Sequence, residues 1–234
     1  MSKVRAAASD KGQEYKLTAK QWIVYYYLIS ISRHKITETH YYIYKNEINI
    51  SKFSRILKVS RPTFYSAIKK MTDVGIMMEF TDYYHIEIPE VYAEINRNMI
   101  TYLLLYQRFM GADLLRVYIV LLRWWQVSAK KRITFTKKQL VELLSHSKTE
   151  TDRYFTLELI LGMLDHWKIA KIKKQIKISE LGPYTEFLLE SVSDFVPENI
   201  NIEAEMNAPD TCEETFEKIK TELAADPYWA LQAE

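Results

Sequence analysis

Apolar residues follow a helical period in two consecutive stretches, residues 51–57 and 61–71. In the first stretch one helical face is apolar, with Phe53, Ile56 and Leu57. In the second the apolar positions are Phe64, Ala67, Ile68 and Met71. Ser60 is a good N-cap for the second stretch, and Pro62 falls in its first turn, where the missing N–H costs nothing. The pattern predicts two helices joined by a tight turn at Val59, which is a helix-turn-helix.

The opposite face of the second helix carries cations and hydrogen-bond donors. These residue types reach base edges and phosphates in a major groove. The candidate DNA-binding residues are Ser60, Arg61, Thr63, Tyr65, Ser66, Lys69 and Lys70. A surface αα-hairpin with a solvated polar face has the same pattern, but we favour DNA recognition over it.

The pattern around this motif completes a larger unit in residues 16–98. Thr18 caps a predicted helix at 19–32, and residues 41–44 are prone to form a strand. After the two helices, Gly75 suits a left-handed helix end. Residues 76–80 and 84–88 then predict two strands joined by a short loop. Helix, strand, helix, helix, strand, strand is the order of a winged helix.

Residues 99–192 predict the same order again. A strongly apolar helix is expected at 113–127, a strand at 133–135, and a helix from its cap Thr136 to about residue 144. A turn at 145–151, a helix at 152–167 and a strand pair at 169–172 and 175–178 follow. We therefore expect a mainly α, α+β fold with two winged helices in tandem. The alternative is a single all-α domain with one hairpin.

Charge is segregated along the chain although the net charge is only +2. Residues 1–98 hold 15 Lys and Arg against 10 Asp and Glu, residues 99–182 hold 15 against 7, and residues 183–234 hold 2 against 13. Two basic halves and an acidic tail suggest a nucleic-acid-binding body with a separate tail function. We expect residues 1–15 to be flexible and residues 193–234 to form the tail.

The two halves differ in where their cations lie. The second recognition helix carries Asp152, Glu158 and Asp165, which repel phosphates, whereas the first is free of acids from residue 60 to 72. Conversely, the second strand pair is basic, and its Lys171, Lys173 and Lys174 are expected to grip DNA phosphates. An alternative role for the second half is dimerisation, with the helix at 113–127 as the interface.

Three segments follow one another in the chain: LTAKQWIVYYYL, INISKFSRILKVSRPTFYSAIKKM and VGIMMEF. With these segments in this order, the chain resembles the replication initiators of plasmids and the replication-organiser proteins of phages. The resemblance covers roughly residues 16–192. It implies binding to repeated sites at an origin and recruitment of a helicase or its loader. Lys58 stands where the typical motif has Gly. The family's base or backbone contacts carry over to Arg61, Thr63, Tyr65, Ser66 and Lys69.

The acidic tail contains one predicted helix, from about residue 210 or 211 to 225, with an apolar edge of Phe216, Ile219 and Leu223. Three roles stay open for it. It docks a replisome or transcription partner, it covers the basic face until DNA displaces it, or it packs back on the body as a structural helix.

Catalytic motifs are absent from the sequence. There is no Walker-type phosphate loop, and the five His residues show no metal-binding spacing, so we expect no enzyme activity, metal or cofactor. A lone cysteine, Cys212, fits a reducing compartment, and the apolar runs are too short to span a bilayer, so we expect a cytoplasmic protein. The polar N-terminus has no apolar h-region, so we expect no signal peptide. Double-stranded DNA is the expected partner, with a homodimer as a further expectation. The alternative functions are a winged-helix transcription regulator and a protein-interaction scaffold.

Overall fold

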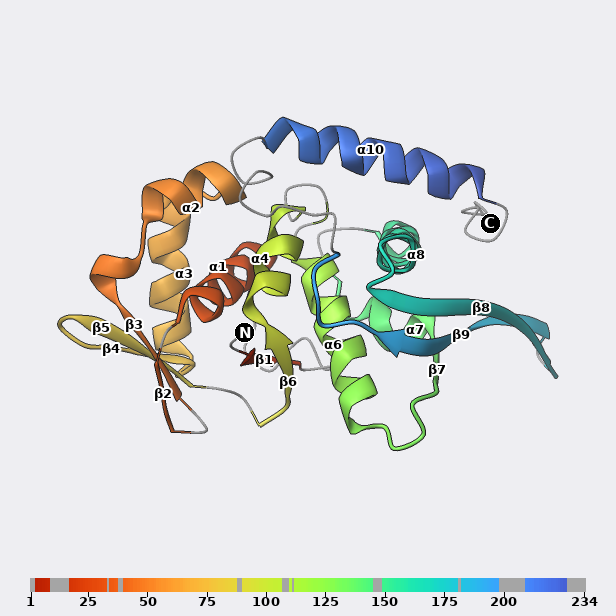
Figure 1. Ribbon diagram of the computed structural model, residues 1–234, viewed down its shortest axis with the longest axis horizontal. Coiled ribbons are helices and arrows are strands. Elements are labelled where there is room, and N and C mark those ends of the chain that lie inside the picture. Colours follow the sequence, from red (N-terminus) through yellow and green to blue (C-terminus); the bar gives the residue numbers. More distant parts are fainter. Residues whose placement is uncertain are drawn as a thin grey trace.

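The computed structural model describes residues 3–8, 17–32, 34–37, 40–87, 90–106, 110, 112–144, 149–180, 182–197 and 209–226. The fold is α+β, with helices around three small antiparallel sheets (Figure 1). The first half contains β1 (Lys3–Ala7), α1 (Ala19–Ile31), β2 (His34–Thr37), β3 (His40–Tyr44), η1 (Lys45–Glu47), α2 (Ile50–Leu57), α3 (Arg61–Asp73), β4 (Met77–Glu79), β5 (Tyr83–Glu87) and β6 (Tyr92–Asn96). The second contains α4 (Arg97–Leu105), α6 (Asp113–Val127), β7 (Ile133–Thr136), α7 (Lys137–Val141), α8 (Glu150–His166), β8 (Ala170–Ser179), β9 (Gly182–Val192) and α10 (Pro209–Ala225).

The same succession of elements occurs twice. It runs α1, β3, α2, α3, β4, β5 in the first half and α6, β7, α7, α8, β8, β9 in the second. The strand order also repeats, because β3-β5-β4 and β7-β9-β8 both place the last strand between the other two. In the first sheet β2 is added outside β3.

The turn that leaves the third helix repeats in atomic detail. Gly75 after α3 and Lys168 after α8 both have a positive φ, 80° and 57°. The next residue in each copy is a buried isoleucine, Ile76 or Ile169. Each of these isoleucines donates its N–H to the carbonyl five residues earlier at 3.0 Å, which closes the helix end. Two segments about ninety residues apart in the chain therefore share one backbone conformation.

The N-terminal segment is part of the core. β1 pairs antiparallel with β6, and Val4 and Ala6 are fully buried. Tyr25 and Tyr26 of α1 hold this strand, because their hydroxyls bond to the N–H and the carbonyl of Ala7, each at 3.3 Å. The expected flexibility of residues 1–15 is therefore wrong for residues 3–8, and the other residues of that segment lie outside the described ones. The partner strand is almost ninety residues away, so the local pattern did not reveal it.

Buried apolar side chains of both halves form one continuous cluster. A cation–π contact joins the two central helices, since the Arg116 guanidinium of α6 lies 5.4 Å from the Trp22 ring of α1. Arg116 is itself buried, and desolvation lowers its pKa. The two halves are thus in direct contact through α1 and α6.

The basic strand region differs from the prediction. Instead of short strands at 169–172 and 175–178, Ala170–Ser179 form the single strand β8, which pairs along its length with β9. Lys173 and Lys174 lie inside this strand because they offer no turn chemistry, and Gly182 has a φ of 111° beside the real turn. β7 pairs only with residues 186–189 of β9, so the far parts of β8 and β9 continue as a two-stranded ribbon (Figure 1).

Other predicted elements agree closely or need small corrections. The helices at 19–32, 113–127 and 152–167 are confirmed within two residues. The helix expected to reach residue 144 ends at Val141, and β2, β6 and α4 were not predicted at all. None of the helices in the described part of the chain is long and apolar enough to cross a membrane.

The predicted tail helix is present as α10, and it packs on the body. Its apolar edge of Phe216, Ile219 and Leu223 is buried, and α10 lies across α8 (Figure 1). Of the three roles left open for the tail, this geometry corresponds to the helix that packs back on the protein.

Candidate nucleic-acid interface

The turn between α2 and α3 is fixed by its backbone and its cap. Lys58 takes the left-handed conformation, with φ 50° and ψ 34°, and Val59 is buried beneath it. The Ser60 hydroxyl accepts the N–H of Thr63 at 3.3 Å and lies 2.8 Å from the Thr63 hydroxyl. The hydroxyls of Ser60 and Thr63 are thus hydrogen-bonded to each other at the N-terminus of α3, where Ser60 caps the helix.

The buried face of α3 matches the predicted apolar stripe. Phe64, Ala67, Ile68 and Met71 are all buried. Phe64 contacts Phe53 of α2 edge-on, with ring centroids 4.9 Å apart, so the two helices are locked together at the turn. This packing fixes which residues of α3 face solvent.

The exposed face of α3 holds the predicted DNA-binding residues together. Arg61, Tyr65, Ser66 and Lys69 are exposed, whereas Lys70 is half-buried. The Arg61 guanidinium donates to the Ser51 hydroxyl at 2.7 Å, which holds it against α2. Lys69 pairs with Asp73 at 3.1 Å, but its side chain is 77% exposed, so the pair is weak and the ammonium stays accessible.

Three further cations belong to this surface and were not among the predicted residues. Lys52, Arg55 and Lys58 are exposed on α2 and the turn. Residues 50–73 therefore hold six Lys and Arg against the single carboxylate of Asp73. The sequence of α2 and the turn could have indicated these three cations, because in proteins that bind DNA through a helix the neighbouring cations contact phosphates.

The β4–β5 hairpin beside α3 contributes acidic rather than basic charge. It carries Glu79, Asp82 and Glu87 and no Lys or Arg. The neighbouring Lys45 pairs with Glu79 at 2.7 Å and lies 5.0 Å from the centre of the Tyr84 ring. The hydrogen bond to Glu79 raises the pKa of Lys45. This hairpin therefore offers no free cation for phosphates among its described side chains.

The predicted phosphate grip on β8 is largely neutralised by the protein itself. Lys171 and Lys173 both pair with Glu190 of β9, at 2.9 and 2.6 Å. The hydrogen bonds from Lys173 and Lys171 lower the pKa of Glu190. The three charges on this face leave one net positive charge, although both ammonium groups remain about half exposed or more.

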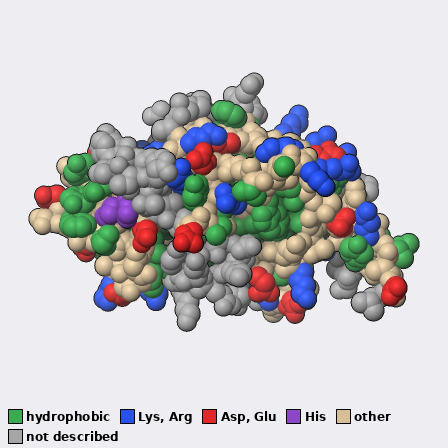
Figure 2. All heavy atoms as spheres, turned by 90° about the horizontal axis from the view of Figure 1, so that it is seen from below, with side chains coloured by type: hydrophobic (Ala, Val, Ile, Leu, Met, Phe, Trp, Pro, Cys, Tyr) green, Lys and Arg blue, Asp and Glu red, His purple; other side chains and the backbone are tan. Residues whose placement is uncertain are grey.

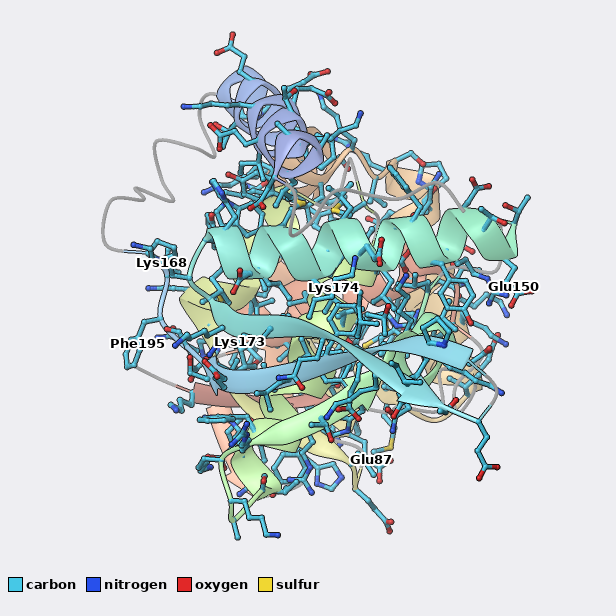
Figure 3. All side chains as sticks on the ribbon, turned by 90° about the vertical axis from the view of Figure 1, so that its right-hand side faces the viewer. Glu87, Glu150, Lys168, Lys173, Lys174 and Phe195 are labelled. Carbon is cyan, nitrogen blue, oxygen red and sulfur yellow. The ribbon has the colours of Figure 1, made fainter. Side chains whose placement is uncertain are left out.

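Lys174 lies apart from the other two lysines. Its side chain is on the opposite face of β8, between the strand and α8 (Figure 3). There it is 3.6 Å from the buried Glu158, which Lys137 of α7 also contacts at 2.5 Å. Lys174 therefore helps to compensate a buried carboxylate and does not join Lys171 and Lys173.

The third helices of the two halves have different surroundings. α3 exposes one full face, whereas α8 is buried on all sides from Thr156 to Leu164. α10 covers the side of α8 that faces away from the body (Figures 1 and 3). Of these two helices, α3 has a face open to solvent, whereas α8 is covered.

Comparison of the chain with protein-family models, with curated proteins and with solved structures found no match. Within the described ranges no three His, Cys, Asp or Glu side chains are grouped closely enough to hold a metal ion.

Proposed function

We propose that this protein binds double-stranded DNA sequence-specifically through α3 in the major groove, as a replication initiator or organiser of a plasmid or phage. The observation that carries the DNA-binding part is the surface of α2, the turn and α3. This surface presents six cations against one carboxylate, and three of the cations lie on α3, whose orientation is fixed by the turn. The replication role rests on the resemblance of the sequence to such initiators.

A tandem winged-helix fold is part of this proposal. It is supported by the repeated element order and by the repeated strand order. The turns at Ile76 and Ile169 support it further, because the carbonyl of each accepts an N–H at the end of the last strand. The donors are Glu87 at 2.8 Å and Ser193 at 2.6 Å.

A protein-interaction scaffold is the second candidate. The covering of α8 by α10 favours it for the second half, because a covered third helix is not available to a DNA groove. The two candidates differ in one property. Only a DNA-binding protein has an affinity for duplex DNA that falls with salt.

The test is selection of bound sequences from random duplexes, followed by affinity measurements on the selected duplex. Arg61→Ala should lower affinity about tenfold or more and relax the preference at one base position, as loss of a base contact does. Lys69→Ala should weaken binding to all sequences and reduce the salt dependence by about one phosphate contact.

Lys218→Ala on α10 is the matched control. Lys218 is 76% exposed and pairs with Glu222 four residues on, as the 77% exposed Lys69 pairs with Asp73. It should leave affinity unchanged. Equal effects of the two lysine variants would contradict a specific role of α3, and the lack of salt-dependent binding would favour the scaffold.

A further inference from the structure

One end of the molecule presents an aromatic sheet face to solvent. Along β3 and β5 the residues alternate, so that Tyr41, Ile43, Tyr84 and Ile86 are buried and their neighbours point outward. We call the outward set of β3, β4 and β5, together with the residue that follows β4, the aromatic face. It consists of His40, Tyr42, Tyr44, Met78, Phe80, Tyr83, His85 and Glu87.

The rings of the aromatic face form one continuous layer. His85 stacks between His40 and Tyr42, with centroids 4.2 and 4.8 Å away. Tyr42 contacts Tyr83 at 5.1 Å, and Tyr83 stacks on Phe80 at 4.7 Å. Aromatic residues and Met are enriched in the buried centres of protein interfaces. Here three large apolar side chains remain 43%, 43% and 46% exposed, namely Tyr44, Phe80 and Met78.

The charges on and beside the aromatic face are negative. Glu87 is exposed opposite His40 of β3, and Asp82 is exposed in the turn between β4 and β5. Glu79 and Lys45 at the rim pair with each other at 2.7 Å and so cancel. The sequences of β3, β4 and β5 contain no Lys or Arg. Figure 2 shows Asp and Glu on both sides of the hydrophobic and His side chains at this end.

This charge excludes one ligand of aromatic sheet faces and favours another. Single-stranded nucleic acid stacks its bases on such rings, but it needs cations along its phosphates. The carboxylates of Glu87 and Asp82 repel phosphates instead. They attract Lys and Arg, and a guanidinium also stacks favourably on the rings of Tyr and Phe. The ligand that fits is therefore a protein segment with apolar side chains and cations.

The positions of the two carboxylates specify the segment further. Asp82 precedes the first residue of β5 and Glu87 is the last, so they lie about 17 Å apart at opposite ends of the ring layer. An extended segment that crosses the layer meets a carboxylate at each end. It should therefore carry an apolar centre between two cations that are about five residues apart.

We propose that the aromatic face binds a segment of a partner protein with this pattern, an apolar centre flanked by Arg or Lys. The apolar centre packs on the rings, and the two cations lie near Asp82 and Glu87. The aromatic face is on the side of its sheet away from the core. Binding of the partner segment does not depend on DNA binding.

The test is selection of random peptides of about twelve residues, displayed on phage, on the full chain; this length is enough to cross the face. Peptides that also bind a face variant, Tyr44→Thr with Phe80→Thr, are removed. These two changes keep β-branched residues in the sheet. The selected peptides should share the cation–apolar–cation pattern. A labelled selected peptide should bind the unmodified chain about tenfold or more tighter than the face variant.

A second variant tests the charge alone. Glu87→Lys reverses an exposed carboxylate of the aromatic face and should weaken the selected peptide by about tenfold. Glu180→Lys is the matched control, because Glu180 is an exposed carboxylate in the turn of the β8–β9 hairpin, and it should have no effect. Circular dichroism of each variant checks that it is folded.

Three results would overturn the proposal. The first is that no selected peptide distinguishes the unmodified chain from the face variant. The second is that the selected peptides lack cations, or that Glu87→Lys binds them as tightly as the unmodified chain does. The third is that a different ligand occupies the face. Sedimentation velocity tests for a second copy, and titration with single-stranded DNA tests for nucleic acid; loss of either interaction in the face variant would identify that ligand instead.

Discussion

Replacement of Ile219 by Ala measures how strongly α10 is bound to the body. The side chain is 3% exposed and lies in the apolar edge that faces α8. The change removes three buried carbons, and at about 0.8 kcal/mol for each the transfer loss is roughly 2.4 kcal/mol. The cavity left behind adds to this loss. We therefore expect the free energy of unfolding to fall by about 3 kcal/mol.

Urea unfolding followed by circular dichroism gives this value, with Lys220→Ala as the control. Lys220 lies on the exposed side of the same helix and pairs with the exposed Glu217, so its loss should cost less than about 0.5 kcal/mol. If α10 opens before the rest, hydrogen exchange of α8 amides should speed up instead while global stability falls less. The docking of α10 is refuted if Ile219→Ala changes neither stability nor exchange more than the control does.

Substitutions at two further positions test the charges and the turn of the proposed interface. Glu190→Gln removes the carboxylate shared by Lys171 and Lys173. If the β8–β9 ribbon contacts DNA phosphates, the affinity for DNA should rise. The slope of log affinity against log salt concentration should then steepen by up to about 0.9 for each new phosphate contact. Anisotropy titrations at several salt concentrations measure this, and an unchanged slope would show that the ribbon is not on the DNA. Lys58→Gly relieves a left-handed residue and should stabilise the protein by about 0.5–1 kcal/mol, whereas Lys58→Ala should not. Both Lys58 variants should weaken DNA binding equally, since both remove the cation. A higher melting temperature for Lys58→Ala would contradict the idea that the left-handed backbone at Lys58 is strained.

Local patterns predicted the parts of the fold that are determined locally. The caps at Thr18 and Ser60, the apolar stripes of α1 and α3 and the left-handed Gly75 all depend on residues within a few positions. The missed parts depend on distant partners. β1 is short, and only its pairing with β6 and the tyrosines of α1 makes it a strand. The pairing of β8 with β9 was missed for the same reason.

The candidate site likewise has a part that the local sequence predicted and a part that depends on distant partners. The exposed face of α3 followed from its helical period, and the structure brings Arg61, Tyr65, Ser66 and Lys69 onto one surface. The lysines of β8 could not be assigned from the sequence, because their partners Glu190 and Glu158 lie in other elements. A run of lysines in a strand does not show which of its charges are already compensated.

The covering of α8 gives a physical reason for the opposite charge patterns of the two halves. A third helix that faces DNA must avoid carboxylates, and α3 has none before Asp73. A third helix that is covered is free of this requirement, and α8 carries Glu158, which is buried between Lys137 and Lys174. Once that carboxylate is buried, its lysine partners are needed to offset its desolvation. Part of the basic character of β8 therefore follows from the burial of α8, and its lysines need no phosphate partner to explain them. By this argument the acid-free face of α3 is the stronger sign of DNA binding, and the lysines of β8 add to it only as far as Glu190 leaves them free.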